Sequence, residues 1–273
     1  MNIFPLITIP IQHVHTLLPT YHLIAERETS FVYSCTCIQL ESHLKGISPI
    51  ARNGFGEAPV PSITFDDGHA SQHRYALPLL QKHGIKAIFF SIAGWVDQRV
   101  DYMTSAQLRE LISLGHDVQS HGYSHRMLTR CSDSELVLEL TASRTELEQK
   151  LGTPVDALSI PFGRWDSRVL QACCAAGYKK VYTSDPYPVI HCAEAIALRG
   201  RFMVRRSTTE CNIQSALHGR ARSLHVIRVA HECKKIARRL MGEDLYHCVW
   251  GLLASRRTLD EVSSEYAEHK ESE

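Results

Sequence analysis

Two adjacent carboxylates close a short apolar stretch of the chain. Asp66 and Asp67 follow the run Ser-Ile-Thr-Phe (62–65) and stand directly before Gly68. Because two neighbouring negative charges repel, the pair needs an explanation. One is a solvated turn, since Asp and Gly are common turn residues. The other is a site for a positive ion, and these residues alone do not choose between the two.

Two histidines form a second group with chemical potential. His121 and His125 are four residues apart and follow the stretch His-Asp-Val-Gln-Ser (116–120). Two imidazoles at this spacing can bind one divalent cation. The chain contains 16 histidines, so the pair could also be two unrelated side chains. Taken alone, the pair is a weak indication of a metal site.

A third stretch, Ile-Pro-Phe-Gly (160–163), predicts a loop that proline and glycine hold in shape. Its backbone amides could face a substrate oxyanion, although a plain turn is the simpler interpretation. The three stretches are more informative together. One carboxylate and two histidines would bind a metal and leave positions for water and substrate. The second carboxylate would then accept the proton of the metal-bound water.

The elements that must position these residues follow a regular alternation from residue 60 onward. Thr104 with Gln107, and Ser132 with Glu135, have the spacing of helix capping boxes. The alternation predicts βα units around a parallel sheet, either a barrel or a doubly wound sheet. Each motif then follows a strand, where such folds place their sites. The strand-like runs are 62–65, 85–94, 116–121, 156–160 and 179–184, and the helical ones are 71–84, 104–115, 132–152 and 167–177.

Composition restricts the class of protein. The chain has 273 residues, of which 44% are hydrophobic and 22% charged, as in a globular protein of one large domain with extensions. The formal net charge of +1 gives no bulk attraction to nucleic acid. Nine cysteines without a regular framework indicate reduced thiols. The apolar N-terminus lacks the basic region and cleavage site of a signal peptide, which predicts a cytoplasmic protein.

The two ends of the chain differ from its middle. We expect residues 1–60 to be an N-terminal extension packing on the barrel, 60–215 the catalytic domain, and 216–273 a helical extension with an acidic tail. Residues 220–241 are basic with a helical pattern. They predict either a packing helix with a solvated basic face or a peripheral contact with an anionic membrane surface.

The ordered motifs resemble those of polysaccharide deacetylases of the NodB-homology type, carbohydrate esterase family 4. The first family motif, T-F-D-D-G, is intact at residues 64–68. The second, H-[S/T]-x-x-H, occupies 121–125 with Gly122 at the hydroxyl position. The third, R-x-P-[F/Y]-G, is partial, because Ser159 stands at the arginine position. The resemblance covers roughly 60–185, with a fainter echo at Tyr-His-Leu-Ile (21–24).

This resemblance implies an α/β fold, the distorted (β/α) barrel of the NodB-homology type. It also implies a hydrolase that acts on carbon–nitrogen bonds other than peptide bonds and removes N-acetyl groups from an amino sugar. Asp67, His121 and His125 would bind a divalent metal, usually Zn²⁺, and Asp66 would be the catalytic base. The N–H of Phe162, beside Pro161, would bind the carbonyl of an N-acetylated glycan.

Three departures from the family pattern leave open questions. The arginine that steadies the base is missing, and Arg164, Arg199 or Arg206 could replace it. Asp185 is the nearest candidate for the family's aspartate-tryptophan motif.

The general acid has only His191 and His218 as candidates, and each could equally be a surface histidine. Two alternatives to a glycan deacetylase therefore remain open. One is a hydrolase of another carbon–nitrogen amide bond, and the other is a catalytically impaired protein that binds glycans.

Overall fold

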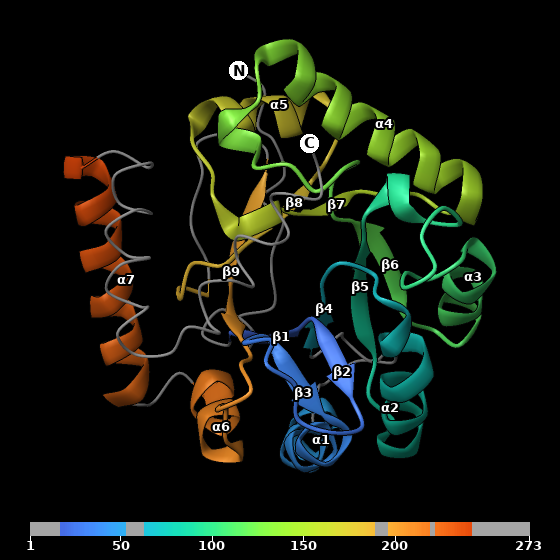
Figure 1. The fold of residues 1–273 in the computed structure, drawn as a ribbon, viewed down its shortest axis with the longest axis vertical. Helices are drawn as coiled ribbons and strands as arrows, with labels where there is room; N and C mark the ends of the chain where they lie inside the picture. Colours follow the sequence, from blue (N-terminus) through green and yellow to red (C-terminus); the bar gives the residue numbers. More distant parts are fainter. Residues whose placement is uncertain (1–16, 53–62, 189–195, 219–221, 242–273) are drawn as a thin grey trace, which may run out of the picture.

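A closed barrel of seven parallel strands forms the centre of the molecule (Figure 1). The structure is a computed structural model that describes residues 17–52, 63–188, 196–218 and 222–241. A separate two-stranded sheet of β2 (Leu23–Ala25) and β3 (Ser34–Thr36) lies beside the barrel. The barrel strands, in their spatial order, are β1 (Leu18–Tyr21), β4 (Ile63–Phe65), β5 (Ala87–Ser91), β6 (Asp117–Ser120), β7 (Ala157–Ser159), β8 (Lys180–Thr183) and β9 (Ala197–Met203).

From β1 to β8, helices connect the successive barrel strands and surround the barrel, as the alternation predicts (Figure 1). A π-helical turn at Gln72–Ala76 leads into α2, and a 3₁₀ turn at Pro161–Gly163 follows β7. The closed sheet confirms the barrel and excludes the doubly wound alternative. The α-helices are α1 (Cys37–Arg52), α2 (Leu77–His83), α3 (Ser105–Ser113), α4 (Asp133–Leu151), α5 (Ser167–Ala175), α6 (Glu210–His218) and α7 (Arg222–Met241).

Both predicted capping boxes are confirmed. The Thr104 side chain accepts a hydrogen bond from the Gln107 amide and begins α3, and Ser132 does the same with Glu135 for α4. Gly152, with φ of 70°, ends α4 in the left-handed conformation that glycine adopts without steric cost. The two N-caps fix where the loops after β5 and β6 end, and the loop after β6 carries His121 and His125.

Two barrel strands, β1 and β9, were not foreseen. We expected residues 1–60 to be an extension packing on the barrel, yet β1, within this range, pairs with β4 on one side and β9 on the other. The β1 stretch is short and contains Pro19, and β9 carries two arginines and a glycine. Neither has the apolar run that indicates a buried strand. Together they close the barrel next to the first motif.

The barrel interior is partly polar. Thr20 and Thr64 share a hydrogen bond of 2.8 Å there, and Arg201 lies against the rings of Phe90 and Tyr182. Side chains alternate between the two faces of a strand, so Thr64 and Asp66 point inward while Phe65 stacks outward on Phe89. The end of β4 therefore delivers Asp66 into the barrel mouth.

The seven cysteines within the described ranges are all free thiols. Among the helices that the structure describes, none combines the length and the apolar composition needed to cross a membrane.

Candidate metal centre and active site

Asp67, His121 and His125 converge at the carboxyl ends of β4 and β6. The Oδ1 atom of Asp67 lies 3.3 Å from Nε2 of His121 and 3.5 Å from Nε2 of His125. The potential ligand atoms of all three residues lie within 4.8 Å of one another. Tetrahedral Zn²⁺ with bonds of about 2.0–2.1 Å places its ligands about 3.3 Å apart. The two Asp67–His distances therefore fit one ion held between these atoms.

The imidazole of His121 is oriented by β7. Its Nδ1 donates to the backbone carbonyl of Ser159 at 2.8 Å, which leaves Nε2 with its lone pair facing Asp67. A partner of this kind on the far nitrogen is the usual support of a metal-binding histidine. Burial lowers the pKa of His125 to about 4, so its neutral, metal-binding form predominates at neutral pH.

Backbone strain is concentrated at the site. Four non-glycine residues in the described part of the chain have positive φ, and three of them are Asp67 (72°), His125 (62°) and Phe162 (59°). Such conformations cost of order 1–3 kcal/mol each and persist where the surrounding structure holds them. The loops after β4, β6 and β7 thus hold costly conformations that aim these residues at one point.

Glu139, from α4, holds the histidine loop. Its carboxylate accepts hydrogen bonds from the amides of Tyr123 and Ser124 at 3.1 and 3.0 Å, and from the Ser124 hydroxyl. Gly122 has φ of 77°, which disfavours a side chain at the position where the family has a hydroxyl. Glu139 of α4 therefore supports the loop that contains His121 and His125, in which Gly122 stands where the family motif has a hydroxyl residue.

Asp66 is buried beside the candidate metal ligands and is held by a bidentate ion pair with Arg201. The two guanidinium nitrogens lie 2.7 Å from its two oxygens, and the Ser159 hydroxyl donates to Oδ2 at 3.0 Å. Burial would raise the pKa of Asp66, but the charges of Arg201 and His121 hold it below its ordinary value. Asp66 is thus ionised at neutral pH. Three of about four acceptor positions of its carboxylate are used, which leaves one for a substrate water.

Arg201 fills the place of the missing motif arginine, and none of our three candidates does. Arg164 contacts Met127, and Arg206 contacts the carbonyl of Ser30. Arg199 precedes Arg201 by two residues on β9 and so shares its inward face, one step further from the barrel mouth. The Arg201 Nη2 also donates to the Ser159 hydroxyl at 2.8 Å. Arg201 therefore contacts the serine that stands at the arginine position of the third motif.

The Pro161–Phe162 loop lies against the metal ligands. The Phe162 ring centroid is 4.8 Å from that of His125, and 37% of Phe162 remains exposed. Pro161 lies next to Gly122, where an added Cβ would be 3.4 Å from its Cγ. The structure thus brings both predicted oxyanion residues to the edge of the cluster.

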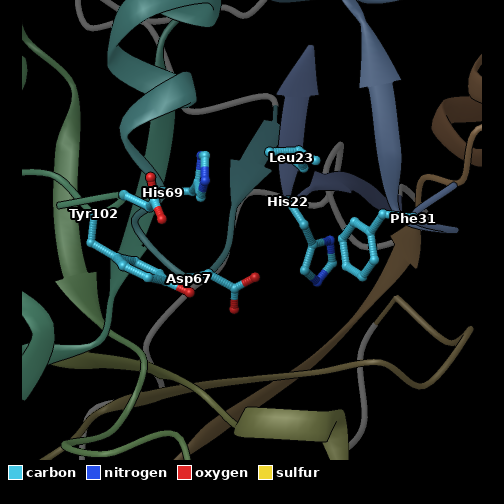
Figure 2. A pocket seen from close by; sticks show the side chains of 7 residues that line it. His22, Leu23, Phe31, Asp67, His69 and Tyr102 are labelled. Carbon is cyan, nitrogen blue, oxygen red and sulfur yellow. The ribbon is translucent and has the colours of Figure 1, made fainter. Parts of the chain in front are cut away.

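A pocket of about 250 Å³ opens beside Asp67 (Figure 2). His22, which directly follows β1, lines it with Asp67, and its buried Nδ1 has no hydrogen-bond partner among the described residues. Burial raises the pKa of Asp67, but its hydrogen bond with His121 and the imidazoles around it, His22 among them, hold that pKa below the ordinary value. The faint Tyr-His-Leu-Ile echo was the only sequence signal for His22. The other lining residues are Leu23, Phe31, His69, Asp101 and Tyr102.

Two of the remaining candidates, His218 and Asp185, lie within the described residues. His218 ends α6, where the neighbouring Ala216 carbonyl accepts from the amide of Leu17, which precedes β1. This places His218 at the amino end of the barrel, opposite the site. His191 lies outside the described residues. Asp185 accepts hydrogen bonds from Trp165 at 2.7 Å and Thr183 at 3.0 Å, and it pairs with His231.

Residues 55–181 match the polysaccharide deacetylase family. A chitooligosaccharide deacetylase of Bradyrhizobium sp. (strain ANU 289) is 32% identical over 127 residues, which are 45% of this chain and 56% of that protein. The putative polysaccharide deacetylase YxkH of Bacillus subtilis is 28% identical over 124 residues, or 45% of this chain and 44% of that protein. The chain thus spans about half the length of these curated relatives.

Solved structures with a similar fold include the deacetylase PplD of Streptococcus pyogenes. It has a TM-score of 0.62 and 20% identity, covering 74% of this chain and 98% of that one. A polysaccharide deacetylase from Bacillus cereus has a TM-score of 0.63 and 23% identity, covering 74% and 68%. At these identities the likeness concerns the fold, and it confirms the predicted barrel.

Proposed function

Because the chain belongs to the polysaccharide deacetylase family, we propose that it is a metal-dependent hydrolase that removes N-acetyl groups from an amino sugar of a glycan. The arrangement of Asp67, His121 and His125, with Asp66 beside them, carries this proposal. Relatives described as chitooligosaccharide and peptidoglycan N-acetylglucosamine deacetylases support the substrate class.

A divalent ion such as Zn²⁺ bound by the three residues would polarise the amide carbonyl and make water more acidic. Asp66 accepts a proton from the attacking water through its remaining acceptor position. Arg201 and Ser159 fix the orientation of that carboxylate. The Phe162 N–H donates to the carbonyl oxygen as negative charge develops on it. The loops that carry these groups are already held in place before substrate binds.

The carbon–nitrogen bond then breaks, and the departing nitrogen needs a proton to leave as an amine. Two histidines, His22 and His69, line the pocket with Asp67. The Nδ1 of His69 is bonded to the Ser71 hydroxyl, whereas the Nδ1 of His22 has no partner among the described residues, so we assign the donor to His22. The products are acetate and a free amino sugar. The water supplies the oxygen that acetate gains, so the atoms balance without any other reactant.

Replacing His22 by glutamine should lower kcat by about 10²–10⁴ while leaving metal affinity unchanged, since the residue donates a proton and does not bind the ion. Steady-state kinetics with metal titration tests both parts. Unchanged kcat in His22→Gln would rule out His22 as the donor.

Acetate release from N-acetylglucosamine oligomers tests the proposed function. Metal-stripped protein should be inactive and regain activity with Zn²⁺ or Co²⁺. His125→Ala should bind the ion poorly and release no acetate. His218→Ala, a histidine at the opposite end of the barrel, serves as the matched control and should behave as the wild type.

The same panel separates the alternatives. An ion bound to the intact cluster without acetate release from any sugar would overturn the deacetylase. Turnover of other carbon–nitrogen amides would then point to a different hydrolase. Oligomer binding without turnover at any metal loading would point to a glycan-binding protein.

A further inference from the structure

Helix α7 contacts the rest of the protein through one polar face. The Arg228 guanidinium donates to the Pro186 carbonyl at 2.9 Å, His231 lies 3.0 Å from Asp185, and Glu232 accepts from the Tyr187 hydroxyl at 2.9 Å. Leu224, on the same side of the helix, is buried. This face anchors α7 to the loop after β8 through an ion pair and hydrogen bonds.

The opposite face of α7 is apolar and exposed. Val226, Val229, Ile236 and Leu240 expose between 48% and 80% of their surface, and Cys233 between them is also exposed. The spacing of three and four residues aligns all five along one side of the helix. A helix whose only role was packing would bury this side. The expectation of a packing helix with a solvated basic face therefore does not account for this exposed apolar side.

Positive charge is concentrated on the same helix. The sequence of α7 contains six basic residues and one acidic residue, Glu232, so its formal charge is +5. The whole chain has a net charge of only +1, so the helix has a much larger positive charge than the chain as a whole. The basic residues are Arg222, Arg228, Lys234, Lys235, Arg238 and Arg239.

We propose that α7 binds an anionic lipid surface, with the stripe from Val226 to Leu240 inserted among the acyl chains. Helices with a continuous apolar side and a basic polar side lie in the plane of such surfaces. The helix has 20 residues and stands at one side of the barrel (Figure 1). Each basic residue near the surface strengthens binding about fivefold.

Charge decides between a membrane and a second copy of the chain. Two α7 helices packed stripe to stripe would bring two +5 segments together, and this repulsion opposes association. An anionic lipid surface is attracted by the same charges. The inference stands independently of the deacetylase activity, because lipid binding is measured without substrate.

Vesicle flotation tests the proposal with the full chain. Phosphatidylcholine vesicles that contain about a third phosphatidylserine should carry the protein, and pure phosphatidylcholine vesicles should carry much less. Salt at about 1 M should weaken binding because it screens the charges. Ile236→Glu, on the stripe, should reduce binding at least about tenfold. Val137→Glu, at an exposed valine of α4, is the matched control and should float as the wild type.

Light scattering of the same variants in solution completes the test. Both should be monomeric with unchanged Tm, because the substituted side chains are exposed. Absence of flotation with anionic vesicles at low salt would overturn the proposal, as would equal flotation of Ile236→Glu and the wild type. A dimer that Ile236→Glu dissociates would assign the stripe to a second copy instead.

Discussion

Replacing Asp66 by asparagine is expected to lower the rate of acetate release by about 10²–10⁴, because the amide cannot accept the proton of the attacking water. Asparagine has nearly the same shape, so the three metal ligands should keep their positions. The expected result is a protein that binds one equivalent of metal and turns over little substrate. Parallel measurement of bound Zn²⁺ and acetate release checks both parts.

This substitution also leaves the buried Arg201 without a charged partner. Removal of one member of a buried ion pair typically costs about 3–5 kcal/mol of unfolding free energy. Asp66 is 2% exposed and Arg201 1% exposed, so the full cost should apply. The double variant Asp66→Asn with Arg201→Met removes both charges and should recover much of this stability without recovering activity. Activity of Asp66→Asn near that of the wild type, in a folded protein, would exclude Asp66 as the base.

The candidate metal ligands could be brought together from sequence because each motif follows a strand that has a clear apolar signal. Asp67 follows a run of buried residues, and His121 and His125 follow another. The carboxyl ends of parallel strands meet at one end of a barrel, so three local motifs were enough to predict one site. Knowledge of the barrel's closure was not needed for this, although it was the family resemblance that assigned Asp67, and not Asp66, to the ion.

The residues that sequence reasoning missed all depend on that closure. Arg201 reaches Asp66 only because β9 returns to pair with β1, which brings residues 135 positions apart together. His22 faces Asp67 only because β1 pairs with β4. Arg199 and Arg201 are two residues apart on β9, so both point to the same face of the strand. The alternation of side chains therefore does not tell which of the two arginines lies level with Asp66. Only the register between the strands does.

Substituting Arg201 is the most direct test of this unforeseen contact. Arg201→Met keeps the volume of the side chain between Phe90 and Tyr182 but removes the positive charge beside Asp66. We expect unfolding free energy to fall by about 3–5 kcal/mol, because a buried carboxylate is left without its partner. Activity should fall as well, since Asp66 loses the two hydrogen bonds that orient it.

The pH–rate profile separates this positioning role from a purely structural one. Burial raises the pKa of Asp66, and Arg201 is the largest influence that lowers it. Without Arg201 the pKa should rise, so the acidic limb of kcat/KM should move to higher pH. Arg199→Met is the matched control, an arginine on the same face of the same strand, and should leave that limb in place.

An arginine placed at position 159, where the family motif has one, should restore part of the activity that is lost without Arg201. The Ser159 hydroxyl lies 3.0 Å from Asp66. In the double variant Ser159→Arg with Arg201→Ala, the new guanidinium would therefore reach the same carboxylate from β7. Partial recovery of activity, with the acidic limb shifted back to lower pH, would show that Asp66 needs the charge and not a particular strand to supply it. Normal activity and an unmoved acidic limb in Arg201→Met would mean instead that the ion pair serves the fold alone.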